Sequence, residues 1–295
     1  MTKRALVLGG GGPVGIAWEA GLLAGLARGG ADLAEADYIV GTSAGSFVGA
    51  QLALGKPAAD LAGAILAEAD RAAPAGAGAR PAAPPNLIVL FQKMQEAASG
   101  ERDPQGVRKE IGDFSLASQT MDEAAFINSF GRSFSQLPDD AWPARNFACT
   151  AVDVENGEFV VWNAASKVGV VRAVASSCSV PGVYPAVTIG GRRYMDGGMR
   201  SPTNADLAKG YERVVVIAVR IEMEGARTDR MRKALDDELQ VLRQSGGRVQ
   251  LIVPDAASGA AFGANLMDFR QRPGAARAGE AQGRALAADL KAWWG

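Results

Sequence analysis

The N-terminal part of the chain alternates short apolar runs with helical patterns. Residues 4–8 (RALVL) lead into a glycine cluster, and residues 38–40 (YIV) form a second apolar run. Each run is typical of a buried β-strand. The segments 16–27 and 44–54 place apolar side chains at helical spacing and end at glycines. The repeated order of strand, loop and helix predicts parallel strands joined by crossover helices.

The middle of the chain, residues 56–145, has a different pattern. Helical periodicity dominates it, and Phe126, Phe130 and Phe134 recur every four residues on one helix face. We expect this aromatic stripe to pack in a core, with an acyl-binding groove as the alternative. Residues 72–85 are nearly all Ala, Gly and Pro, which is typical of a linker or a flexible flap. We therefore predict a mainly helical insertion beside the sheet.

Strand patterns return after the insertion, at residues 147–152, 158–162, 213–219 and 248–253. An Asn-Gly pair between the first two predicts a hairpin. We expect one domain over residues 1–295, with an α/β core formed by residues 4–55 and 146–255. Residues 256–295 are expected to form a C-terminal helical segment.

Composition narrows the function classes. The chain has 295 residues, a net charge of -1 and no histidine, and 48% of its residues are hydrophobic. Such a balance is typical of a soluble globular protein and gives no sign of a basic surface for nucleic acid. No apolar run reaches the roughly 18 residues of a membrane span, and the apolar start is too short for a signal peptide. We therefore expect a cytoplasmic protein. Because the two cysteines match no metal spacing, we expect no metal site.

Residues 41–45, Gly-Thr-Ser-Ala-Gly, lie between a predicted strand and a predicted helix. This placement is typical of a nucleophilic serine on a sharp turn, with Ser43 as the nucleophile. A serine needs a base to take its proton, and the usual histidine is absent. A plain helix-capping serine is one alternative. A pairing of Ser43 with Lys56 is another.

The glycine cluster at residues 9–15, GGGGPVG, offers backbone N–H groups next to a helix N-terminus, which suits a negative charge. It also fits the dinucleotide fingerprint GxGxxG. That fingerprint requires an acidic residue at the end of the second strand, but Asp32, Glu35 and Asp37 all precede the apolar centre of this strand. A dinucleotide-binding oxidoreductase is therefore only an alternative.

A third motif, Asp196-Gly197-Gly198, follows a predicted strand and by itself predicts only a turn. Together, the GGGGPVG, GTSAG and DGG motifs resemble those of the patatin-like phospholipase family. The small-residue stretch 176–185 resembles the family's segment ahead of DGG. The order and spacing of these four blocks make the resemblance specific. It covers about residues 4–55 and 146–220.

The resemblance implies a three-layer α/β/α fold with a central, mostly parallel sheet. It also implies a Ser-Asp dyad of Ser43 and Asp196, which needs no histidine, and an oxyanion hole at Gly10, Gly11 and Gly12. The implied function is hydrolysis of phospholipids or neutral acyl esters through an acyl-serine intermediate, without a cofactor. The expected partner is a lipid or acyl ester substrate, with transient contact at a membrane surface as an open alternative.

One residue departs from the family pattern. Where the family's glycine loop usually carries Arg or Lys, this chain has Val14, preceded by Pro13, which has no N–H. This leaves both phospholipids and neutral esters open as substrates. A catalytically weak scaffold that binds lipid or a partner protein is a further alternative.

Overall fold

The structure is a computed structural model that describes residues 2–71, 85–98, 101–131, 133–134, 137–219 and 226–295. Its centre is an eight-stranded sheet in the order β5-β6-β3-β2-β1-β7-β8, with β4 also paired to β3. The strands are β1 (Arg4–Leu8), β2 (Tyr38–Gly41), β3 (Phe147–Asp153), β4 (Phe159–Trp162), β5 (Val187–Ile189), β6 (Arg192–Asp196), β7 (Arg213–Ile217) and β8 (Arg248–Ile252).

The middle of the sheet is parallel, and its edge near β5 is antiparallel. The strands β3, β2, β1, β7 and β8 run in one direction, so the predicted mostly parallel sheet is confirmed. The register pairs Leu8 at the end of β1 with Gly41 on one side and Ile217 on the other. The carboxyl ends of these strands therefore meet at one edge, where ligands bind in open α/β sheets.

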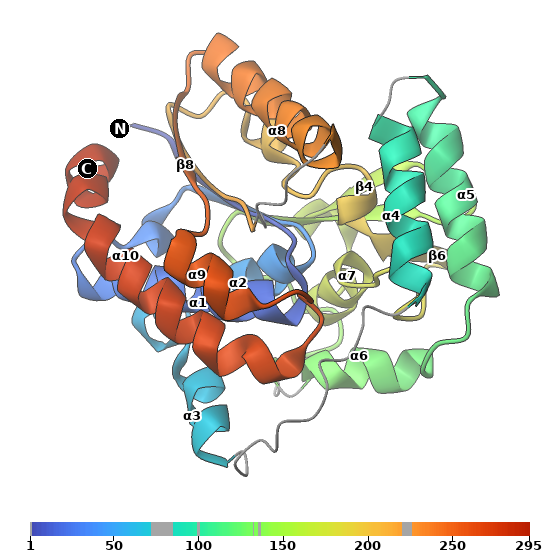
Figure 1. Ribbon diagram of the computed structural model, residues 1–295, viewed down its shortest axis with the longest axis horizontal. Helices are drawn as coiled ribbons and strands as arrows, with labels where there is room; N and C mark the ends of the chain where they lie inside the picture. The colour runs from blue at the N-terminus through green and yellow to red at the C-terminus, as the bar shows by residue number, and fades with distance from the viewer. Residues whose placement is uncertain (1, 72–84, 99–100, 132, 135–136, 220–225) are drawn as a thin grey trace.

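Helices cover both faces of the sheet, which confirms the three-layer fold (Figure 1). On one face, Leu6 and Leu8 of β1 pack in a core with α1 and α10. On the other face, Ala5 and Val7 pack with α8. The alternation follows from the two-residue period of a strand. The helices are α1 (Gly12–Arg28), α2 (Ala44–Ala53), α3 (Gly63–Arg71), α4 (Pro85–Ala98), α5 (Pro104–Ala117), α6 (Glu123–Gly131), α7 (Val170–Ser177), α8 (Ala226–Gln244), α9 (Ala256–Phe262) and α10 (Arg272–Trp294).

The helices α3 to α6 lie between β2 and β3 in the chain, within the predicted helical insertion. Leu87 and Leu90 of α4 are buried in a separate core with Val152 and Met195 of the sheet. The helices α4 and α5 therefore extend the core along the antiparallel part of the sheet (Figure 1). Of the predicted flexible segment, residues 72–84 lie outside the described residues, and Pro85 begins α4.

The start of α1 differs from the predicted one. The helix begins at Gly12, not at Ile16, because Pro13 occupies the first turn, where its fixed φ suits a helix and its missing N–H costs nothing. The glycine loop is therefore short, and α1 starts directly at the sheet edge.

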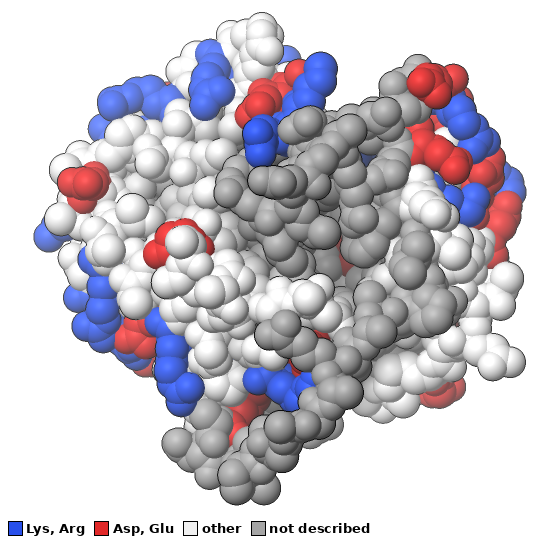
Figure 2. Space-filling model, in the orientation of Figure 1, with Lys and Arg blue, Asp and Glu red and all other residues white. Residues whose placement is uncertain are grey.

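The described surface has no dominant charge on the face drawn in Figure 2, where basic and acidic side chains are interspersed. None of the helices formed by the described residues is both long and apolar enough to cross a bilayer.

Candidate active site

Ser43 lies on a sharp turn between β2 and α2. Its backbone has φ 52° and ψ -117°, a conformation that residues other than glycine rarely adopt. Its side chain makes no capping bond to α2, which contradicts the helix-capping alternative. The residue is 6% exposed and lines a cavity. The turn therefore aims the hydroxyl away from the helix and into the cavity.

The two glycines of the motif permit this turn. A Cβ atom at Gly41 would collide with the backbone of Gly45, and one at Gly45 would collide with the carbonyl of Leu8. The turn therefore packs against the end of β1, and no larger residue fits at either position.

The stretch 176–185 holds the backbone of Ser43. The Ser43 N–H donates to Ser177 Oγ at 3.0 Å. The Ser43 carbonyl accepts from Ser46 Oγ at 2.6 Å and from Cys178 Sγ at 3.1 Å. These bonds offset the strain of the turn, which explains why small polar residues occupy this stretch.

Asp196 lies at the end of β6, next to Ser43. The Ser43 side chain lies close enough to the Asp196 carboxyl to lower the pKa of Asp196. The carboxyl accepts a hydrogen bond from the Gly198 N–H at 2.7 Å, and the Asp196 N–H donates to the Ser179 carbonyl at 3.0 Å. Burial raises the pKa of Asp196 to about 7, and Ser43 and Gly198 oppose that rise. The structure thus brings together Ser43 and Asp196, which are far apart in the sequence.

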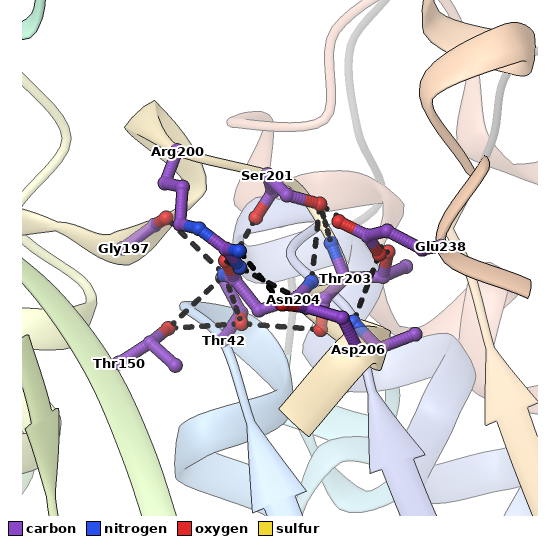
Figure 3. Close-up of polar contacts among 10 residues, drawn as sticks. Thr42, Thr150, Gly197, Arg200, Ser201, Thr203, Asn204, Asp206 and Glu238 are labelled. Carbon is purple, nitrogen blue, oxygen red and sulfur yellow. Dashed lines mark hydrogen bonds and ion pairs between the residues drawn. The ribbon is translucent and has the colours of Figure 1, made fainter. Parts of the chain in front are cut away.

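A buried amide connects the two sides of this pair. Asn204 Nδ2 donates to Thr42 Oγ1 at 3.0 Å, to the Ser201 carbonyl at 2.7 Å and to the Gly197 carbonyl at 3.3 Å (Figure 3). Thr42 precedes Ser43, and Gly197 follows Asp196. Asn204 therefore couples the turn at Ser43 to the turn at Asp196. The sequence motifs did not identify Asn204. Its position eight residues after Asp196 is the one signal in the sequence, and this position alone does not indicate a role.

A second layer of charged groups fixes the orientation of that amide. Arg200 Nη1 donates to Asn204 Oδ1 at 2.9 Å, and the guanidinium binds Asp206 through two bonds of 2.8 and 2.7 Å (Figure 3). Glu238 of α8 accepts from Thr203 Oγ1 at 2.6 Å. Because Arg200 can only donate, the Asn204 oxygen must face it and the NH₂ group must face Thr42.

The glycine loop lies beside Ser43. The Gly10 N–H donates to the Pro202 carbonyl at 2.7 Å and is therefore not free to bind an oxyanion, contrary to the sequence hypothesis. No partner of the Gly11 or Gly12 N–H is seen among the described residues. Gly12, with φ 59°, begins α1 and lines the cavity with Ser43. The positive ends of the α1 and α2 dipoles thus both point to the serine.

The cavity in front of Ser43 has a volume of about 570 Å³. Its wall is largely apolar and aromatic, with Phe47, Phe126, Phe130 and Tyr184 among the side chains that form it. A cavity of this size and lining suits an apolar ligand of small to moderate length.

The aromatic stripe of the insertion packs in the core, as expected, and two of its residues also line the cavity. Phe126 is 2% exposed and packs in the core while also lining the cavity, and Phe130 lines it beside Phe126. Phe134, beyond the end of α6, packs edge to face on Phe47 with ring centroids 5.4 Å apart. The stripe is therefore at once core and cavity wall.

The pairing of Ser43 with Lys56 was the other arrangement open from the sequence. Lys56 Nζ donates to Gln51 Oε1 at 3.0 Å at the end of α2, away from the cavity lining, so a Ser-Lys pair is not formed. Within the described part of the chain, no group of three or more Cys, Asp or Glu side chains could hold a metal ion.

The fold and the turn define an α/β protein with a serine at a hydrolase-type strand-to-helix turn. The family model for patatin-like phospholipase matches residues 6–209, so the chain belongs to the patatin-like phospholipase family. Membership supports a lipid hydrolase.

Two solved structures are similar in outline. VipD from Legionella pneumophila has a TM-score of 0.45 and 13% identity, with 98% of this chain and 67% of VipD covered. The type III effector protein ExoU has a TM-score of 0.43 and 15% identity, with 98% of this chain and 53% of ExoU covered. The chain thus spans about half of ExoU. A comparison with curated protein sequences gave no match.

Proposed function

We propose that this protein is a lipid acyl hydrolase that cleaves carboxylic esters through an acyl-serine intermediate. One observation supports the proposal above all: the Ser43 side chain lies close enough to the buried Asp196 carboxyl to lower its pKa, at the wall of an apolar cavity. In a chain without histidine, this contact supplies both a nucleophile and a base. We retain the expectations of one catalytic domain and of a cytoplasmic protein that meets its substrate at a lipid surface.

The reaction takes place in two halves. Ser43 Oγ attacks the ester carbonyl carbon while its proton passes to the Asp196 carboxylate. The tetrahedral intermediate then collapses, the bond to the alcohol breaks, and Asp196 returns the proton to the leaving alkoxide. A water molecule next attacks the acyl-serine and gives its proton to Asp196, which passes it to Ser43 as the fatty acid leaves.

The pKa of Asp196 suits this role. A carboxylate with its ordinary pKa of about 4 is a weak base at neutral pH. Burial raises the pKa of Asp196 to about 7, which makes it a stronger base that is still largely ionised above neutrality.

The oxyanion of the intermediate would accept hydrogen bonds from the Gly11 and Gly12 N–H groups at the start of α1. Two features support this: neither N–H has a partner among the described residues, and Gly12 lines the cavity. Gly10 would hold the loop through its bond to Pro202. Removing one such donor typically costs about 10²–10³ in rate.

The acyl chain would occupy the aromatic part of the cavity. Phe47, Phe126 and Phe130 line it next to Ser43, and they bury apolar surface without offering hydrogen-bond partners. Binding there would leave the ester group at the serine and exclude water from it.

Turnover of a 4-nitrophenyl acyl ester series tests the proposal. We expect Ser43→Ala and Asp196→Asn each to lower kcat by on the order of 10⁴-fold or more, because both groups act in the same step. Ser258→Ala is the matched control, since Ser258 is a fully buried serine bonded to Gln282 on another helix. Retained turnover in Ser43→Ala would overturn the mechanism. Absence of turnover in the unmodified chain would favour the binding scaffold.

A further inference from the structure

Arg272 is the one charged side chain among the described residues that line the cavity. It is the first residue of α10, and Met267 and Phe269 just before it line the same cavity. The cavity therefore has an apolar wall near Ser43 and a single positive group at the start of α10.

The guanidinium of Arg272 is only partly satisfied. Its Nη1 lies 3.0 Å from Glu68 Oε1 of α3, and the group lies over the Phe269 ring at 5.6 Å. Its Nε is buried and has no hydrogen-bond partner among the described residues. A buried donor without a partner is unfavourable, so such a group needs an explanation. The ion pair with Glu68 therefore does not satisfy the whole guanidinium group.

The geometry of a guanidinium permits a second anion. Glu68 binds at Nη1, whereas Nε belongs to another edge of the planar fork. Oxyanions with two or more oxygens, such as phosphate, bind such an edge through parallel hydrogen bonds. The side chain is 18% exposed, and burial lowers the pKa of Arg272 while Glu68 opposes that change. A partly buried cation of this kind interacts with an anion more strongly than one in open water does.

The glycine loop offers no charge of this kind. Val14 is fully buried in the core, and Pro13 beside it has no N–H to donate. Any positive contact with substrate in this cavity must therefore come from elsewhere, and Arg272 is the described residue that can make it.

We propose that Arg272 binds a phosphate-type oxyanion of the substrate and gives the cavity a preference for acyl esters that carry this group over neutral esters. The inference rests on the proposed function in one respect, that an acyl ester occupies this cavity. It assigns the selection of substrate charge to the start of α10.

Equilibrium binding to the Ser43→Ala protein tests this without any turnover. The probes are a lysophosphatidic acid and a monoacylglycerol with the same acyl chain, both below their aggregation concentrations. We expect the phosphate-bearing lipid to bind about 10-fold more tightly, and Arg272→Gln to abolish the difference, because a hydrogen bond to a charged group contributes about that much. Inorganic phosphate, added alone as a competitor, separates a lipid headgroup site from a site for free phosphate.

Two further variants sharpen the test. Glu68→Gln should strengthen the preference, because it removes the competing carboxylate from the same guanidinium. Arg270→Gln is the matched control, since Arg270 is an exposed arginine paired with Asp268 outside the cavity lining, and it should leave the preference unchanged.

Equal binding of the two lipids, or a preference that survives Arg272→Gln, would overturn the inference. If inorganic phosphate displaces the phosphate-bearing lipid but not the neutral one, this supports the charge contact. If it displaces both lipids, the site is one for free phosphate, and the role in substrate choice is overturned. A chain that binds as expected but does not hydrolyse any ester would contradict the proposed function and leave Arg272 supported.

Discussion

Asn204 Nδ2 donates a hydrogen bond of 3.0 Å to Thr42 Oγ1 and thereby ties the loop after Asp196 to the residue before Ser43. Both residues are fully buried. Asn204 has φ 49°, a left-handed conformation that Asn tolerates better than most residues do. The relative position of Ser43 and Asp196 therefore depends on a side chain that touches neither reacting group.

Loss of this bond should affect rate more than binding. We expect Asn204→Gly, which keeps the backbone conformation but removes the amide, to lower kcat by about 10- to 100-fold, because small misplacements of reacting groups have effects of this size. KM should change little. Thr42→Val should also lower kcat, and the effects of the two changes should be less than additive in the double variant, since both break the contact between Asn204 and Thr42.

Gln282→Leu controls for a general loss of buried hydrogen bonds. Gln282 is another buried amide, bonded to Trp18 Nε1 at 3.1 Å and to the Val253 carbonyl at 2.7 Å. The Gln282→Leu substitution should lower the midpoint of thermal unfolding and leave kcat of the folded protein unchanged. Equal effects of Gln282→Leu and Asn204→Gly on kcat would contradict the positioning role.

The pH dependence should follow Asp196. Burial raises the pKa of Asp196 to about 7, and the base acts only when ionised. We therefore expect kcat/KM to rise about tenfold per pH unit below pH 7 and to level off above it. A pH profile of ester turnover that is flat from pH 5 to 8 would contradict the assignment of Asp196 as the base.

The same carboxyl should also make stability depend on pH. In the unfolded chain its pKa is about 4, so between about pH 4 and 7 the folded protein holds a proton that the unfolded chain has lost. The free energy of unfolding should fall as pH rises through this window, by up to about 4 kcal/mol from this group. Asp196→Asn should remove this fall, so the variant should gain most over the unmodified chain at pH 8 in denaturant titrations. No gain at pH 8 would indicate that the buried carboxylate is not costly.

The backbone of Ser43 should limit stability. Its φ of 52° and ψ of -117° favour glycine, and strain of this type costs about 1–3 kcal/mol. We expect Ser43→Gly to be more stable than Ser43→Ala by about 1 kcal/mol, because both lose the hydroxyl but only glycine relieves the backbone. Equal midpoints in chemical denaturation would show that the turn is unstrained.

The cavity should set the length of the acyl chain. Ser129 of α6 lines it, and its hydroxyl donates to the Phe126 carbonyl of its own helix at 2.6 Å. Ser129→Phe should fill part of the cavity and shift the best 4-nitrophenyl ester to a shorter chain. Ser118→Phe is the control, since Ser118 makes the same kind of bond to Phe114 but does not line the cavity. An unchanged chain-length profile in Ser129→Phe would place the acyl group elsewhere.

Much of this arrangement could be predicted from the sequence, because local patterns determine it. The apolar runs of β1, β2 and β7 are buried strands, and Gly41 and Gly45 surround a turn that only small residues permit. Ser43 and Asp196 were found from motifs at the ends of strands, and parallel packing brings such ends together.

The remainder depends on packing between distant segments. Arg272 lies at the cavity because α10 packs along α1, and no motif near residue 272 signals this. The Gly10 N–H is occupied because the loop at Pro202 reaches it, which the glycine cluster could not indicate. The early start of α1 was missed because glycines at 11 and 12 are typical of a loop, although Pro13 is a helix-start signal.

The central claim is that Ser43 is the nucleophile, and mass spectrometry of the protein after treatment with an alkyl fluorophosphonate tests it most directly. We expect a single covalent adduct on the peptide that contains Ser43, formed faster above pH 7 than at pH 5, and no adduct in Ser43→Ala. An adduct that forms equally in Ser43→Ala, or that maps to another residue, would contradict the account.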